Sequence, residues 1–105
     1  MPQFAVHRNP SRATRAAIPL LLDVQSELLE SLHTRVVIPL YKAGAVREGI
    51  METLTPLVEV DGKRYVAVAP ELAGVSRKAL GAQVGDLSDR RYDIVAALDL
   101  LITGI

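Results

Sequence analysis

Short apolar runs, separated by polar stretches with proline or glycine, fill the first two thirds of the chain, and this pattern is typical of β-strands. Three runs have the length of buried strands: 4–7, 20–24 and 35–40. Residues 8–12 contain turn formers and a proline, so we expect a loop there. Because proline has no amide hydrogen for a sheet, Pro19 and Pro39 must lie at strand ends, edges or bulges.

A hairpin over residues 57–68 is the clearest strand signal. Asp61-Gly62 at its centre supplies the two positive-φ residues that a type I′ turn requires. Alternation along the second strand leaves neither face purely polar, and we expect Tyr65 to be an exposed contact.

Two segments have weaker patterns. Residues 42–53 show mixed helical spacing that is broken by Gly44 and Gly49, and they are interpreted as irregular or as a short helix. Residues 69–85 contain one proline and three glycines, which favours loops with one or two short strands over a long helix.

The end of the chain carries a helix signal over residues 90–102. Ser88 can cap this helix by accepting a hydrogen bond from a first-turn amide, and Asp89 places negative charge near the positive end of the helix dipole. Apolar residues recur at three- and four-residue intervals and should pack on the sheet: Ile94, Ala97, Leu98 and Leu101, flanked by Val95 and Ile102. The solvent side receives Arg90, Asp93 and Asp99. Gly104 should end the helix in a left-handed conformation, with Ile105 beyond the last turn.

The composition fits one globular domain over residues 1–105, because half of the residues are apolar and 23% are charged. A formal net charge of zero disfavours general binding to nucleic acid or to an anionic membrane. The absence of cysteine excludes disulfides, zinc-thiolate sites and thiol nucleophiles. No signal-peptide order or membrane span is present, and we expect a cytoplasmic protein.

Candidate chemistry is sparse. His7 and His33 have no helical ligand partner, so no metal is expected. Asp23, near Ser26, could suggest an acid and hydroxyl pair, but a strand end followed by a turn explains it structurally. The glycines form no phosphate-binding loop, so no nucleotide cofactor is expected. Three loop arginines are either a solvated basic surface or a site for an acidic peptide: Arg8, Arg12 and Arg15.

Several short blocks resemble the CcdB-type toxins of bacterial toxin–antitoxin pairs. Their order and spacing over nearly the whole chain carry the resemblance: Asp23-Val24-Gln25-Ser26, Val37-Ile38-Pro39-Leu40, Ala73-Gly74-Val75, Asp86-Leu87-Ser88 and Gly104-Ile105. The resemblance implies a mainly-β (α+β) fold, a twisted antiparallel sheet of SH3-like barrel character with a small β-wing and a C-terminal helix. It also implies a homodimer.

The function implied by the resemblance is that of a gyrase poison without catalytic activity. Such toxins bind the A subunit of DNA gyrase, trap the enzyme with cleaved DNA, and are neutralised by the disordered C-terminal segment of a CcdA-type antitoxin. By resemblance, Thr103, Gly104 and Ile105 are the gyrase-binding residues. Thr103 replaces a tryptophan that often stands at this position, and losing such an anchor commonly costs about 2 kcal/mol of binding free energy. Residues expected to contact the antitoxin are Arg8, Arg12 and Tyr65.

Two other functions remain open on the sequence. One is a MazF-like endoribonuclease of similar fold, although the loop arginines lack acid and hydroxyl companions at a fixed spacing. The other is a degenerate dimeric module that binds a peptide and poisons nothing. No cofactor is expected in any of the three.

Overall fold

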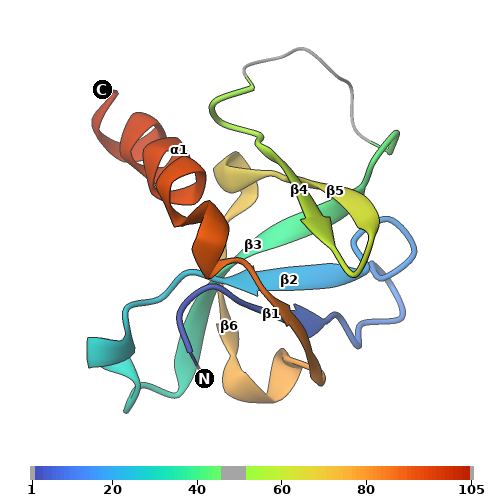
Figure 1. Ribbon diagram of the computed structural model, residues 1–105. Helices are drawn as coiled ribbons and strands as arrows, with labels where there is room; N and C mark the ends of the chain where they lie inside the picture. The colour runs from blue at the N-terminus through green and yellow to red at the C-terminus, as the bar shows by residue number, and fades with distance from the viewer. Residues whose placement is uncertain (1, 46–51, 105) are drawn as a thin grey trace.

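The computed structural model describes residues 2–45 and 52–104, and in them the chain forms a curled antiparallel sheet with one α-helix at its C-terminal end (Figure 1). The strands are β1 (Ala5–Arg8), β2 (Leu20–Asp23), β3 (Thr34–Lys42), β4 (Leu57–Val60), β5 (Lys63–Ala67), β6 (Ala73–Ser76) and β7 (Gln83–Asp86). The α-helix is α1 (Arg91–Thr103), and short 3-10 turns cover Glu27–Leu29, Ala69–Glu71, Arg77–Ala79 and Ser88–Arg90. The mainly-β fold expected from the resemblance is confirmed.

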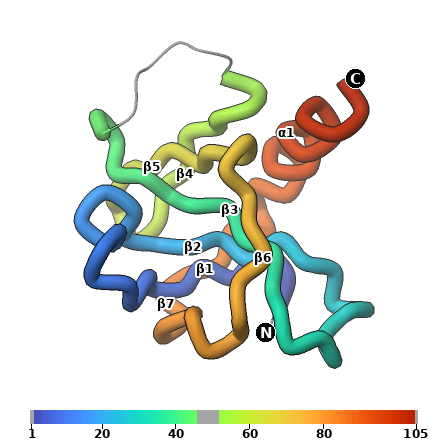
Figure 2. Tube along the Cα trace, turned by 180° about the vertical axis from the view of Figure 1, so that it is seen from behind, coloured from blue at the N-terminus to red at the C-terminus, as the bar shows by residue number. Residues whose placement is uncertain are grey.

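The sheet has the strand order β4-β5-β3-β2-β1-β7, and β6 pairs with β3. One edge of β3 pairs with β6 along its first half and with β5 along its second half, while its other edge pairs with β2. The long third strand therefore lies at the centre of the sheet, which curls around it into a half-barrel. Figure 2 shows the same arrangement from behind, with β6 crossing in front of β3.

The predicted hairpin is confirmed, with β4 and β5 paired from Leu57↔Val66 to Val60↔Lys63. Asp61 and Gly62 have φ values of 52° and 77°, the positive angles that the tight turn requires. The expected strands 4–7, 20–24 and 35–40 are present as β1, β2 and β3 with shifts of one or two residues at their ends.

The prolines behave differently from each other. Pro19 precedes β2, as expected, but Pro39 lies inside β3, so the prediction that it ends a strand or sits at an edge is wrong. The carbonyl of Pro39 accepts a hydrogen bond from Val68 N, on the edge of β3 where β6 gives way to β5. The N–H and C=O of one strand residue point to the same edge of the strand. The N–H that Pro39 lacks would therefore point to the place where β6 gives way to β5, and no hydrogen bond between paired strands is lost.

The core fills the concave side of the sheet and is closed by α1. Alternate residues of the central strands point into it, among them Leu20 and Leu22 of β2 and Ile38 and Leu40 of β3. From α1, Ile94 and Ala97 are fully buried. The predicted apolar stripe is therefore correct in its first turns, but Leu101 and Ile102 are exposed because the end of the helix extends beyond the sheet (Figure 1).

The start of α1 differs from the prediction. Ser88 does not cap the helix, because its hydroxyl donates to the carboxylate of Asp86, which also accepts from Ser88 N at 2.7 Å. The hydrogen bonds from Ser88 lower the pKa of Asp86. Asp86 thus forms an Asx-turn just before the 3-10 turn Ser88–Arg90, and the N-cap position of α1 is Arg90.

The predictions for the two weakly patterned segments, 42–53 and 69–85, compare differently with the structure. Residues 69–85 contain two short strands, β6 and β7, with 3-10 turns and loops, as expected. In the other segment, Lys42 ends β3, residues 43–45 and 52–55 form turns and bends, and the remainder of the prediction, at 46–51, lies outside the described residues. Within the described part of the chain, no helix has the length and apolar character needed to cross a membrane.

Candidate functional site

The end of α1 forms an exposed apolar tip. The exposed fraction is 74% for Ile102 and 36% for Leu101, and Thr103 and Gly104 are also exposed. Gly104 has φ 77° and its amide donates to Leu100 O at 3.0 Å, so the predicted left-handed helix end is confirmed. Ile105, the last predicted binding residue, lies outside the described residues. Because Ile94 and Ala97 anchor the helix in the core, the tip is presented on a rigid element.

The hydroxyl of Thr103 is turned back onto its own helix. Its Oγ1 donates to Asp99 O, one turn earlier, at 2.6 Å. Such i−4 bonds satisfy a threonine hydroxyl without an external partner. The outward surface of the tip is therefore aliphatic in character, formed chiefly by Ile102.

A second exposed apolar surface, which sequence reasoning missed, is the leucine turn at residues 26–32. Its three leucines are exposed by 93%, 49% and 45%: Leu28, Leu29 and Leu32. This turn and α1 both lie along the left-hand side of Figure 1. Three leucines fall within five residues of the sequence, but this spacing alone does not show whether they are buried or exposed.

Buried polar side chains hold the leucine turn from beneath. Asp23 Oδ2 and Arg35 Nε form a fully buried ion pair at 2.7 Å, and Gln25 N donates to Asp23 Oδ1 at 3.0 Å. The Gln25 side chain then donates to Leu29 O at 3.1 Å and accepts from Val36 N at 3.0 Å. The structural interpretation of Asp23 is confirmed, because its carboxylate is committed to this network.

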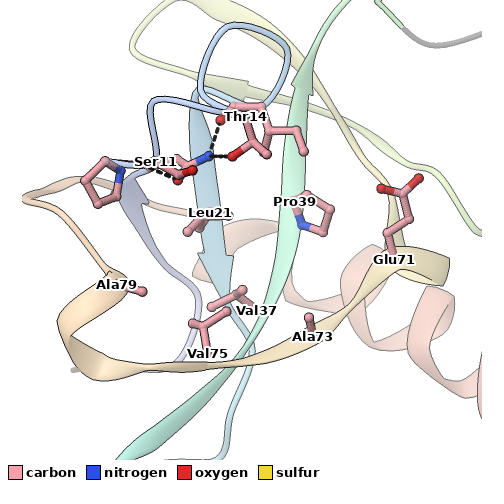
Figure 3. Close-up of a pocket in the computed structure, with 12 residues that line it drawn as sticks. Ser11, Thr14, Leu21, Val37, Pro39, Glu71, Ala73, Val75 and Ala79 are labelled. Atoms are coloured by element: carbon pink, nitrogen blue, oxygen red, sulfur yellow. Dashed lines mark hydrogen bonds between the residues drawn. The ribbon is translucent and has the colours of Figure 1, made fainter.

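An apolar groove of about 540 Å³ lies on the opposite face of the sheet from the core (Figure 3). Its floor is the outward side of β2 and β3, and its walls are the loop after β1 and the segment from Glu71 to Ala79. Lining residues include Ile18, Leu21, Val37, Pro39, Ala73 and Val75.

Asn9 gives the loop wall its shape. This residue is 8% exposed, and its side-chain amide donates to Thr14 Oγ1 at 2.9 Å and to Ile18 O at 2.8 Å, while its Oδ1 accepts from Ser11 N at 3.1 Å. Figure 3 shows these bonds across the loop. At the far wall, Tyr41 donates its hydroxyl proton to Glu71, and this bond raises the pKa of Tyr41 to about 12.

The expected antitoxin contacts are only partly brought together. Arg8 and Arg12 are exposed, at the end of β1 and in the loop that walls the groove. Tyr65 is half-buried and packs against the core, so the expectation of an exposed ring is wrong. The reason is its register opposite Lys42, because this position shares the core-facing side of β3 with Leu40.

The two histidines lie apart and form no joint site. His7 is buried in β1, with Nδ1 3.1 Å from Gly81 O, whereas His33 is exposed just before β3. In residues 2–45 and 52–104, no group of three or more His, Cys, Asp or Glu side chains is placed to hold a metal ion.

Comparison with known proteins gives two findings. The family model described as "CcdB protein" matches residues 3–104. Among solved structures, one described as "Crystal structure of Mtb toxin" is similar with a TM-score of 0.67 and 14% sequence identity, over 95% of this chain and 99% of that chain. At this identity the structural similarity concerns the fold.

Proposed function

This chain belongs to the CcdB family of toxins from toxin–antitoxin pairs, and we propose that it poisons DNA gyrase. In this proposal the tip of α1, with Thr103, Gly104 and Ile105, binds the A subunit. The observation that carries it is Ile102, an isoleucine 74% exposed at the end of a helix whose other end is fixed in the core. An apolar side chain held outward by a rigid element is suited to fill a pocket on another protein.

Poisoning of this kind needs binding and no chemistry by the toxin. A ligand shifts an equilibrium between states only as far as it binds one of them more tightly. The toxin therefore acts by binding more tightly to gyrase with cleaved DNA than to gyrase with rejoined DNA.

The proposal includes a homodimer, as the family resemblance implies. The leucine turn supports it, since Leu28, Leu29 and Leu32 expose apolar area that a partner would remove from water. Sedimentation at micromolar concentration should show a dimer, and a monomer at that concentration would contradict this part of the proposal.

Neutralisation by a CcdA-type antitoxin is assigned to the groove and its basic loop. The lining is apolar, while Arg8 and Arg12 stand exposed beside it, a combination that suits a peptide with both apolar and acidic side chains. Glu71 keeps its negative charge when it accepts from Tyr41, so acidic side chains of the peptide should lie at the basic loop and not at this wall. Tyr65 lies on the core-facing side of the sheet, so the proposed contacts in this groove are those of the loop arginines and the apolar lining.

Induced expression in a gyrase-sensitive host tests the proposal. The full chain should arrest growth with DNA damage signalling, and removal of residues 104–105 should relieve both. Arg12→Ala is the matched control, because it should stay toxic while losing rescue by the antitoxin. Rapid messenger RNA decay with intact DNA would instead indicate an endoribonuclease, and no toxicity with retained antitoxin binding would indicate a binding module.

A further inference from the structure

Asp99 lies one turn before the tip on the same side of α1 as Thr103. Residues four apart are neighbours on a helix surface, and one turn advances about 5.4 Å along the axis. The hydrogen bond from Thr103 Oγ1 to Asp99 O fixes this relation. Asp99 is exposed, so its carboxylate and the aliphatic tip are available to the same partner.

The charge of Asp99 has no counterpart within the described part of the chain. No salt bridge joins it to a described residue. Asp93, at the other end of the same helix, differs because its Oδ2 lies 2.8 Å from Nη2 of Arg90. One exposed acid on α1 is therefore neutralised locally and the other is not.

The position of Asp99 is also electrostatically unfavourable for the helix. The C-terminal end of a helix carries partial negative charge and favours cations, but the last turn of α1 has no basic residue. An acid near this end adds charge of the same sign. Residues that break a local rule without a compensating contact are concentrated at functional sites.

Among the described residues of the tip, no side chain carries a negative charge that would bind a cation. The Thr103 hydroxyl is engaged by Asp99 O, and Ile102 is apolar. An aromatic ring at position 103 could attract a cation through its face, but a threonine has no such surface. Within the described residues, the negative charge at this end of the molecule comes from Asp99 and from the C-terminal end of the helix.

We propose that Asp99 is a specificity-determining residue of the tip, where its carboxylate pairs with a lysine or arginine of the target while Ile102 fills an adjacent apolar site. The inference rests on the proposed function, since the target is the A subunit of DNA gyrase. In this proposal the carboxylate of Asp99 binds the cation of the target, a role that the threonine at position 103 cannot fill through an aromatic ring.

Calorimetric titration of the purified gyrase A subunit with wild-type toxin and with Asp99→Asn tests the proposal. Asp99→Asn should weaken binding about fivefold, as for loss of an ion pair at a protein surface. Its affinity should also depend less on salt than that of the wild type, because salt above about 0.1 M screens exposed charges beyond about 10 Å.

A control variant separates this role from a general effect on the helix. Asp93→Asn removes an equal charge from α1 and should leave affinity and salt dependence unchanged. Thermal melting should show that Asp99→Asn is at least as stable as the wild type.

The outcomes distinguish this inference from the proposed function. Equal affinity and equal salt dependence of wild type and Asp99→Asn would overturn the role of Asp99 and leave gyrase binding intact. A matching loss in Asp93→Asn would overturn it as well, since the effect would then be one of net charge. Absence of binding by the wild type would overturn both.

Discussion

Asp23→Ala would leave the guanidinium of Arg35 without its carboxylate partner in a part of the protein closed to water. Both side chains are fully buried, and the variant also removes the acceptor of Gln25 N. Removing one member of a buried pair commonly lowers the free energy of unfolding by about 3–5 kcal/mol, because the remaining charge stays buried and loses its hydrogen-bonded counterion. At about 0.05–0.15 kcal/mol per residue, a chain of 105 residues has roughly 5–16 kcal/mol in total. The variant should therefore lose about a fifth of its stability or more.

Burial, and not the ion-pair distance, decides this magnitude. The Arg90–Asp93 pair has almost the same separation, 2.8 Å against 2.7 Å, but it lies at the surface. Exposed pairs contribute about 0.2–1 kcal/mol, so Arg90→Ala should cost less than about 1 kcal/mol. The two variants form a matched comparison within one protein.

Urea unfolding at neutral pH measures both free energies. The double variant Asp23→Leu/Arg35→Met, in which neither charge remains, should be more stable than Asp23→Ala alone, since apolar replacement of a buried pair is often neutral. The reasoning is refuted if Asp23→Ala costs no more than Arg90→Ala, or if the double variant is as unstable as the sum of its single changes.

Three further outcomes are expected. Ile94→Ala should lower the free energy of unfolding by about 2–5 kcal/mol in the same assay, because Ile94 is fully buried between α1 and the sheet. Gly81→Ala should lower the melting temperature, since its Cβ would lie 2.8 Å from Arg8 O, whereas Gly74→Ala meets no atom within 4 Å and should have little effect. In an ultraviolet titration of phenolate formation, Tyr41→Phe should remove the ionisation near pH 12. Because the pKa of Tyr41 is raised in the folded protein, the contribution of Tyr41 to stability is present below about pH 10. This contribution is lost as pH rises through about 12.

Local pattern was sufficient for much of the fold. The Asp61-Gly62 turn and the apolar runs predicted the hairpin and the first three strands, because turn chemistry and period-2 alternation act over a few residues. Pro39 was misplaced because its tolerance depends on β3 changing partners from β6 to β5, a long-range feature. The Ser88 cap was misassigned because Ser88 begins a 3-10 turn, and the N-cap position of α1 is Arg90 two residues later.

The candidate site was less predictable, because exposure is set by the ends of the sheet and not by residue type. The 3.6-residue period placed Ile102 beside the buried stripe of α1, yet the helix extends past the sheet and leaves this residue exposed. Tyr65 was expected to be exposed and is half-buried through its register with Lys42. Its interaction with an antitoxin, like that of Arg8 and Arg12, remains a prediction.

Gyrase-mediated DNA cleavage tests the central claim most directly. Purified toxin is incubated with gyrase, ATP and supercoiled plasmid, and the reaction is stopped with detergent and protease. The full chain should produce linear DNA in proportion to toxin, and the chain without residues 104–105 should not. Plasmid that stays uncleaved at toxin concentrations well above that of gyrase, or equal cleavage with the trimmed chain, would contradict the account.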